Sequence, residues 1–137
     1  LALCIGDVKP LRGTIDKPIA RDPAHRQRMA VVASGREAVS EFVVTERLRI
    51  EGRPYALVRL HPHTGRTHQI RVHLASIGFP IVGDLLYGAR RDPLSQRIAP
   101  RHLLHASELR FRLPSSGLEK ALYAPLPDDF RSVLGGE

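Results

Sequence analysis

The sequence predicts an α+β domain in which a mixed, mostly antiparallel sheet is flanked by short helices. Strand-like alternation over residues 38–50 is followed, after a turn that contains glycine, by a second apolar run. Helix-like spacing is confined to short stretches, and the connections between the strand-like runs are short, which favours antiparallel neighbours. With 137 residues and no internal repeat, the chain is expected to form a single domain, or part of one, around its own core.

The first half is expected to supply strands. Leu1–Val8 has the composition of an apolar strand that is already under way at the first residue. Residues 9–33 contain three prolines and show no period, so they are predicted to be a loop. Ala38–Ile50 alternates apolar and polar side chains, as a half-buried strand does. The turn at residues 51–54 then returns the chain into a second strand, Tyr55–His61, and the two form a hairpin.

The loop predicted over residues 9–33 carries a cluster of basic side chains. These are Arg21, His25, Arg26 and Arg28. Such a cluster is explained either by a solvated loop or by an arm that contacts phosphate groups.

A helix is predicted from about Thr67. Apolar residues recur at helical spacing and place one stripe against a core, namely Ile70, Leu74 and Ile77. Gly78 stands where the helix would end, and Pro80 follows two residues later. The polar, arginine-rich stretch Ala89–Arg101 is expected to be a mobile insert.

The last third is expected to return to strands and to end in a helix. In Leu103–Leu113 the alternation slips between Ala106 and Leu109, which predicts a strand with a bulge. Glu119–Tyr123 is predicted to be the partner strand. A short helix is expected over residues 129–134, with Asp128 as its N-cap.

The charge balance favours a nucleic-acid partner. Lys and Arg number 21 against 14 Asp and Glu, a net charge of +7, and only Lys9, Lys17 and Lys120 are lysine. Arginine binds phosphate with two parallel hydrogen bonds and stacks on bases. A GC-rich genome would also raise the arginine content. Cys4 is the only cysteine, which excludes an internal disulfide and a cysteine zinc site. No apolar run reaches the roughly 18 residues of a membrane helix, so a cytoplasmic protein is expected.

One segment concentrates the charge. Residues 53–82 contain no carboxylate, and a concave wall built from them would be strongly positive. Its basic side chains are Arg53, Arg59, Arg66, Arg71, His61, His63, His68 and His73. Three interpretations stay open: a metal site made of histidines, a phosphate site at the Thr64–Arg66 turn and the helix N-terminus, or a basic surface helix. The metal site is disfavoured because no Cys, Asp or Glu lies nearby in the sequence.

The run TGRTHQIRVHLASIGFPIVGDLLYG, residues 64–88, closely resembles the C-terminal catalytic segment of the RluA/RluD-type RNA pseudouridine synthases. Four further segments are similar to that family and follow its order, so that the resemblance covers nearly the whole chain. They are residues 14–19 with Arg21, residues 28–31, residues 104–106, and residues 124–127 with Phe130. The chain is therefore expected to be the C-terminal part of a pseudouridine synthase catalytic domain, over residues 1–137.

The resemblance implies isomerisation of uridine to pseudouridine within ribosomal or transfer RNA, without a metal or a cofactor. The family uses an aspartate as its catalytic carboxylate, a tyrosine beside the flipped base, and a basic residue that pairs with the aspartate. Arg71 matches that basic residue. An arginine suits this role because it cannot give its proton to the carboxylate. Replacing Arg71 with Ala or Leu is expected to abolish most activity while folding is retained.

Other residues of the motif receive secondary roles. By the same resemblance, Arg66, Thr67, His68 and Gln69 are expected to hold RNA or to orient the loop. For His68, a structural hydrogen bond and an RNA contact remain equal alternatives. Asp84 is expected to cap a turn. Tyr87 is expected to pack in the core.

The chain departs from the family pattern in one respect. The family's aspartate lies in a His-Arg-Leu-Asp-type motif that is missing here, and His25-Arg26 is followed by Gln27-Arg28. The family's tyrosine stands directly before the position of Leu1. Both residues are therefore expected to precede this chain, which would be an inactive fragment of an enzyme.

Two other function classes remain as alternatives. The chain could be a non-catalytic RNA-binding module that kept the scaffold, or, more distantly, a metal-dependent hydrolase that uses the histidines. Without preceding strands, the isolated chain is also expected to expose a sheet edge and apolar surface and to associate with itself.

Overall fold

The structure is a computed structural model that describes residues 1–88, 90 and 92–135. Most of its elements are strands, and the helices are short. They are β1 (Ala2–Ile5), β2 (Arg12–Asp16), β3 (Ile19–Arg21), β4 (Met29–Val31), β5 (Val39–Ile50), β6 (Arg53–Pro62), α1 (Gln69–Ser76), α2 (Pro93–Ile98), β7 (Glu108–Arg112), β8 (Glu119–Tyr123) and α3 (Asp128–Gly135).

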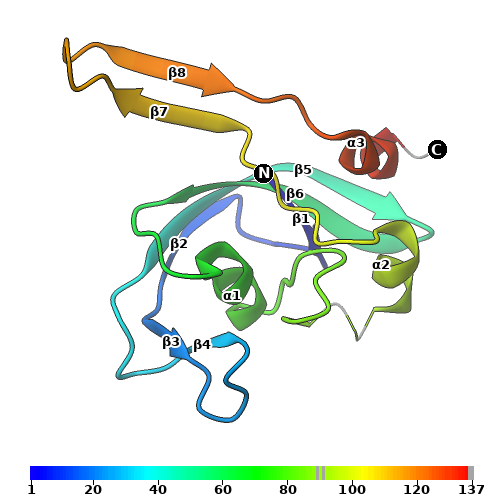
Figure 1. Cartoon of the computed structure of the whole chain (residues 1–137). Coiled ribbons are helices and arrows are strands. Elements are labelled where there is room, and N and C mark those ends of the chain that lie inside the picture. Colours follow the sequence, from blue (N-terminus) through cyan, green and yellow to red (C-terminus); the bar gives the residue numbers. More distant parts are fainter. Residues whose placement is uncertain (89, 91, 136–137) are drawn as a thin grey trace.

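The long hairpin of β5 and β6 is the centre of a four-stranded sheet in the order β1-β6-β5-β2 (Figure 1). Two separate two-stranded ribbons, β3–β4 and β7–β8, complete the strands. All of these pairings are antiparallel. The predicted α+β class with a mostly antiparallel sheet and short helices is confirmed. A register shift interrupts the central hairpin between Val44 and Glu46, where the extra residue lets the strand bend.

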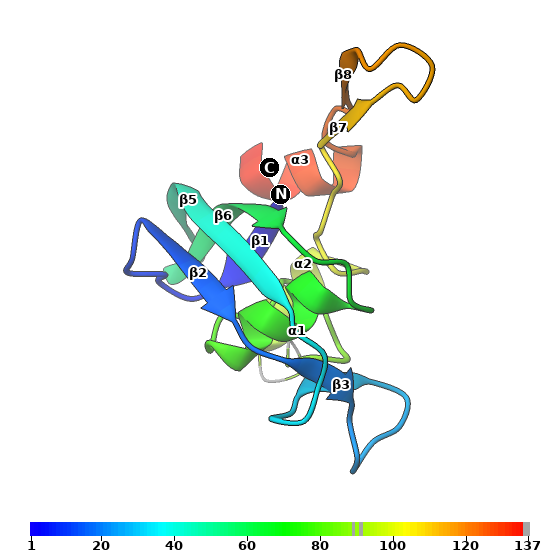
Figure 2. The ribbon, with the colours of Figure 1, turned by 90° about the vertical axis from the view of Figure 1, so that its left-hand side faces the viewer.

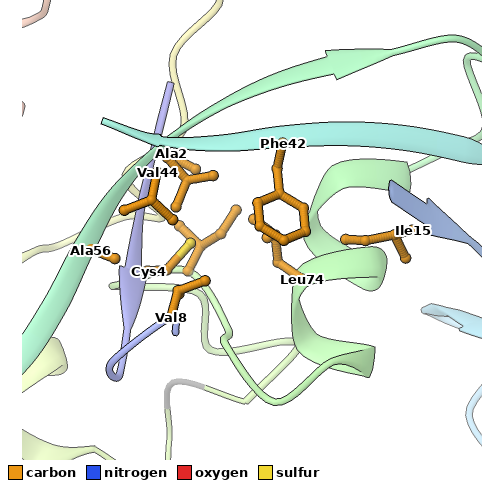
Figure 3. Packing of buried hydrophobic residues seen from close by; sticks show 10 residues of the cluster. Ala2, Cys4, Val8, Ile15, Phe42, Val44, Ala56 and Leu74 are labelled. Atoms are coloured by element: carbon orange, nitrogen blue, oxygen red, sulfur yellow. The ribbon is translucent and has the colours of Figure 1, made fainter. Parts of the chain in front are cut away.

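One face of the sheet packs against α1. The cluster between them is apolar and buried, and Figure 3 shows Phe42 of β5 and Ile15 of β2 directed toward Leu74 of α1. Its other members are Ala2, Cys4, Val8, Val44, Ala56, Val58 and Ile81. Of the predicted helical stripe, Leu74 is fully buried, while Ile70 and Ile77 pack at the edge of this cluster.

The opposite face is also covered. Leu3 and Tyr55 alternate with the residues of the first cluster, and they pack against Leu94 of α2 and Phe130 of α3. Figures 1 and 2 place α1 and α3 on opposite faces of the sheet. Burial on both faces explains why β1 reads as a continuous apolar run rather than an alternating one.

Helix α1 ends as predicted. Gly78 adopts φ +89°, a left-handed conformation that glycine reaches without strain. Its N–H donates to the Ala75 carbonyl at 3.0 Å, and the Phe79 N–H donates to the Leu74 carbonyl at 3.0 Å, which satisfies carbonyls at the helix end.

The loop predicted over residues 9–33 is wrong, because the segment contains β2, β3 and β4. These strands are short, at 5, 3 and 3 residues, and in β2 only Ile15 is buried. Strands of this length, with only Ile15 and Ile19 buried, leave no alternation in the sequence.

The predictions for the later segments need two corrections. The stretch Ala89–Arg101 contains α2, whose Leu94 and Ser95 are buried, so this part is not an unstructured insert; residues 89 and 91 lie outside the described residues. The predicted strand Leu103–Leu113 is divided. Leu103 packs into the core, while β7 starts at Glu108 and pairs with β8 without a register shift. The slip in alternation therefore marks the point where the chain leaves the body.

The C-terminal predictions agree better. The partner strand β8 has the predicted bounds, Glu119–Tyr123. The last helix begins at Asp128, which was expected to be its N-cap. Among the described residues, no helix is both long and apolar enough to cross a membrane.

The β7–β8 hairpin projects from the rest of the chain (Figure 2). All residues of its two strands are exposed, and several of them are apolar. Leu109 and Leu122 face each other across the strands and are 59% and 56% exposed. A two-stranded hairpin with an uncovered apolar face and free edges tends to associate with other chains.

We expect the double substitution Leu109→Thr and Leu122→Thr to weaken self-association of the 137-residue chain by about tenfold or more, since each buried leucine contributes about 1.5–3 kcal/mol. Sedimentation velocity over a concentration series measures this. The control is Leu11→Thr, which removes an equally exposed leucine (56%) elsewhere. Unchanged association in the double variant would contradict the role of the hairpin.

Candidate active site around Arg71

Arg71 of α1 forms a two-pronged ion pair with Asp84. Its Nε donates to Asp84 Oδ2 at 2.8 Å, and its Nη2 donates to Oδ1 at 3.0 Å. The Asp84 side chain is 1% exposed and that of Arg71 is 14% exposed. Parallel charge-assisted bonds of this kind fix the plane of the guanidinium. The hydrogen bonds to Asp84 also raise the pKa of Arg71, so this arginine stays charged in its partly dry surroundings.

The backbone before Asp84 determines where its carboxylate lies. Gly83 has φ +79°, and a side-chain carbon there would come within 2.0 Å of the Arg101 carbonyl oxygen. Asp84 Oδ1 also accepts hydrogen bonds from the N–H groups of Leu86 (3.2 Å) and Tyr87 (3.3 Å). The predicted turn-capping role of Asp84 is therefore confirmed. The sequence did not reveal its second role as the partner of Arg71.

Tyr87 lies against the Arg71 guanidinium. The Cζ atom of Arg71 stands 5.0 Å from the ring centroid, within the range of a cation–π contact. As predicted, Tyr87 packs against a small buried cluster, formed by Ile19, Ala38 and Val72. Its hydroxyl accepts a hydrogen bond from the Met29 N–H at 2.9 Å. Tyr87 thus connects α1 with strand β4.

His68 precedes α1 in a left-handed conformation, with φ 55° and ψ 23°. This conformation costs a residue with a Cβ atom on the order of 1 kcal/mol. The imidazole is held in place, since Nδ1 lies 2.7 Å from the Tyr87 hydroxyl. Burial and the charge of Arg71 lower the pKa of His68, so the neutral ring is favoured. A structural hydrogen bond, one of the two roles considered for His68, is present.

Gln69 is buried, and all of its hydrogen-bonding capacity is used inside the protein. Its Oε1 accepts from the Thr64 hydroxyl at 2.8 Å and from the Arg66 N–H at 3.0 Å. Its Nε2 donates to the Val39 carbonyl at 3.0 Å and to Ser40 Oγ at 2.9 Å. Gln69 therefore ties the turn before α1 to strand β5, which supports orienting the loop over contacting RNA.

Arg66 and Thr67 lie in the same turn and are more accessible. Arg66 is half-buried, and its Nε donates to the Glu37 carbonyl at 2.7 Å. Thr67 is exposed. The structure thus brings Arg66, Thr67 and His68 together at the N-terminal end of α1, one turn from Arg71.

His73 does not face the surface. It is 0% exposed. Its Nε2 lies 2.9 Å from the Lys17 carbonyl oxygen, and its Nδ1 lies 2.8 Å from Ser40 Oγ. A carbonyl oxygen only accepts, so Nε2 carries the proton and Nδ1 accepts from the Ser40 hydroxyl. Burial lowers the pKa of His73.

The expected uninterrupted positive wall over residues 53–82 is wrong. Carboxylates from other parts of the chain neutralise two of the arginines, since Asp84 binds Arg71 and Asp92 binds Arg53 at 2.8 Å. Glu41 also lies 2.8 Å from His63. These carboxylates lie outside residues 53–82, so the charge count of that segment did not include them. Of the four histidines, His61 and His63 lie together with ring centroids 4.8 Å apart, but no group of three or more potential metal ligands occurs among the described residues.

His102 belongs to this neighbourhood and was missed. Burial is the largest cause of the lowered pKa of His102, and the positive charge of Arg71 lowers this pKa further. Nothing in the local sequence marks His102, because it approaches Arg71 only through the packing of residues 99–104 on the sheet.

The Arg71–Asp84 pair should show strong coupling in a double-mutant cycle. Arg71→Leu alone leaves a buried carboxylate unpaired, which costs about 3–5 kcal/mol. The predicted loss of stability replaces the expectation, drawn from the sequence, that the Arg71→Leu variant retains its fold. Asp84→Asn keeps an acceptor for the Leu86 and Tyr87 N–H groups. We expect the double variant to recover about 1–3 kcal/mol relative to the sum of the single variants. Urea denaturation measures the cycle; additive losses would contradict the coupling.

Stability should fall as pH is lowered below neutrality. The pKa values of His68, His73 and His102 are lowered from 6.5 in the folded state, so below this value the unfolded chain binds more protons. The free energy of unfolding should therefore be smaller at pH 5.5 than at pH 7.5. Urea titrations test this. His73→Gln should reduce the difference, whereas His61→Gln, at an exposed position, should preserve it. An equal effect of both substitutions would contradict the assignment.

Comparisons with known proteins identify the family of the chain. An uncharacterized RNA pseudouridine synthase of Chloroflexus aurantiacus is 48% identical over 97% of the chain, and the ribosomal large subunit pseudouridine synthase D of Pseudomonas aeruginosa is 46% identical over 89%. The chain spans 40% of the length of each relative. The solved structure of human RNA pseudouridylate synthase domain containing 1 superposes with a TM-score of 0.77 at 32% identity, covering 94% of this chain and 55% of that one. Residues 3–76, more than half of the chain, match the RNA pseudouridylate synthase family model, and the chain belongs to that family.

Proposed function

We propose that the chain is the C-terminal part of the catalytic domain of a synthase that converts uridine to pseudouridine in large-subunit ribosomal RNA. The observation that carries the proposal is the orientation of Arg71, at the position where the family resemblance expects the basic partner of the catalytic aspartate. Relatives named as ribosomal large subunit synthases favour ribosomal over transfer RNA as the substrate. Work on ribosomal RNA would be carried out in the cytoplasm.

The reaction leaves the atoms of the nucleotide unchanged in number. The bond from uracil N1 to the ribose C1′ breaks, the base turns over, and a bond from C5 to C1′ forms while a proton leaves C5 and N1 takes one up. No oxidant or reductant is needed. The base must first leave its stack, which favours loops and distorted sites in RNA.

Arg71 is prepared for a second carboxylate. Nε and Nη2 are both used by Asp84, and no hydrogen bond from Nη1 to another described residue is present. Asp84 and Tyr87 hold the guanidinium, so Nη1 would be offered to the catalytic aspartate at little cost in side-chain entropy. The charge of Arg71 favours the ionised form of the second carboxylate. Because Asp84 partly neutralises that charge, Arg71 would bind the second carboxylate less tightly than a free arginine would.

Arg66, Thr67 and His68 are proposed to meet the RNA at the open end of α1. Gln69 holds this turn in place, because its Oε1 accepts hydrogen bonds from the Thr64 hydroxyl and the Arg66 N–H. Gln69 itself is proposed to position the loop rather than to contact RNA.

The experiment uses the full-length protein and unmodified large-subunit ribosomal RNA that carries tritium at C5 of uridine. The wild type should release tritium. Arg71→Lys keeps the charge but loses the forked geometry, so the rate should fall roughly 10- to 150-fold, equivalent to about 1.5–3 kcal/mol. Arg71→Leu should reduce it by further orders of magnitude.

The matched control is Arg101→Lys. Arg101 makes a similar forked pair with Asp129, at 2.7 and 2.8 Å, and should tolerate lysine with little change in rate. Near-normal release by Arg71→Lys and Arg71→Leu would contradict the role of Arg71. RNA binding by the wild type without tritium release would favour the non-catalytic RNA-binding module.

A further inference from the structure

A basic arm stands beside the candidate site. It consists of residues 19–31, in which β3 and β4 are joined by an exposed loop (Figure 1). The arm carries Arg21, His25, Arg26 and Arg28 against a single carboxylate, Asp22. Both interpretations of this cluster, solvated loop and phosphate-binding arm, were left open by the sequence.

The loop of the arm is built around Asp22, which is only 8% exposed. Its Oδ1 accepts from the N–H groups of Ala24 at 2.9 Å and His25 at 3.3 Å, and its Oδ2 accepts from Arg28 Nε at 2.7 Å. Arg21 Nη1 donates to the Arg26 carbonyl at 2.7 Å across the loop. These bonds hold the loop in one shape, whereas a merely solvated loop would exchange them for water.

The only carboxylate of the arm is occupied, which leaves other charges free. Asp22 pairs with Arg28. In the part of the chain that the structure describes, neither Arg21 nor Arg26 has a carboxylate within ion-pair distance. Both side chains are exposed. Two guanidinium groups are therefore presented to solvent from a defined loop.

The arm is attached directly to the candidate site. The Met29 N–H donates to the hydroxyl of Tyr87, whose ring lies against Arg71. Ile19 at the base of the arm is 1% exposed and packs with Val72 of α1. A ligand that reached both Arg71 and the arm would therefore meet two parts of one packed unit.

A groove of about 920 Å³ runs between the arm, α1, residues 85–88 and Arg90. Its two carboxylates are both engaged, Asp22 by Arg28 and Asp92 by Arg53 and the Tyr55 hydroxyl. Basic side chains also line it, namely His25, Arg28 and Arg90. Arg71 does not line the groove, although Tyr87 does. Arg21 and Arg26 are not among its lining residues, so the groove borders the arm without including its two exposed arginines.

We propose that the basic arm binds the phosphate backbone of the RNA strand next to the target uridine, with Arg21 and Arg26 as the contacts. The inference rests on the proposed function, since RNA is the polyanion that the site requires. Arginine is suited to this contact because its fork binds phosphate oxygens. Each contact releases counterions, which makes the affinity depend on salt in proportion to the number of contacts.

The test measures binding of the full-length protein to unmodified large-subunit ribosomal RNA over a series of KCl concentrations. For single-stranded contacts, each lost phosphate contact should lower the slope of log K against log[KCl] by about 0.7. The double variant Arg21→Ala and Arg26→Ala should therefore bind roughly 25-fold more weakly at about 0.1 M salt.

Two controls separate the arm from general effects. Arg112→Ala removes one positive charge from the exposed β7–β8 hairpin, far from the arm, and should leave the slope unchanged (Figure 2). Replacing Arg21 and Arg26 with Lys keeps both point charges, so the slope should be close to that of the wild type, which shows that the arm still folds.

A slope in the double alanine variant equal to that of the wild type would overturn the proposal, as would an equal loss in Arg112→Ala. Tritium release by the wild type is read separately. An absence of tritium release by the wild type would contradict the proposed synthase function. The salt dependence of binding would still show whether the arm contacts RNA.

Discussion

The buried ion pair between Arg71 and Asp84 is the interaction on which the rest of the site depends. Placing two charges in a poorly solvated position costs several kcal/mol per ion, and this cost is offset only when the geometry is good and the remaining polar atoms are satisfied. Here the fork contributes two bonds, and Asp84 accepts two more from backbone N–H groups. The helix and the turn after it are therefore tied to each other at one point.

The surrounding polar groups extend this constraint in two directions. Tyr87 lies against the guanidinium, and its hydroxyl reaches both His68 and the Met29 N–H. On the other side of α1, Gln69 fastens the preceding turn to β5. The turn, the helix and the arm are thus held by direct contacts. A substitution of Tyr87 would remove contacts to all three. Such satisfied networks favour a single arrangement over several similar ones.

The distribution of charge follows from which carboxylates are already engaged. Asp22, Asp84 and Asp92 each bind an arginine, and each is nearly buried. Their negative charge is therefore used within the fold, and the excess of arginine is displayed at the turn before α1 and on the arm. This explains how a chain with 14 acidic residues can still present positive surfaces to a polyanion.

Local patterns in the sequence determined the central hairpin, helix α1 with its Gly78 end, strand β8 and the C-terminal helix, since each depends on spacing within one element. The likeness of residues 64–88 to a known family also gave the prediction that Arg71 pairs with a catalytic carboxylate. Only the tertiary structure decided the short strands β2, β3 and β4, because segments of three to five residues with at most one buried side chain carry no period and are held by their partners. It also decided that Asp84 binds Arg71 and that Gln69 points inward. These pairings join residues brought together by the turn at Gly83 and by the packing of α1 on the sheet, and no local pattern encodes such distances.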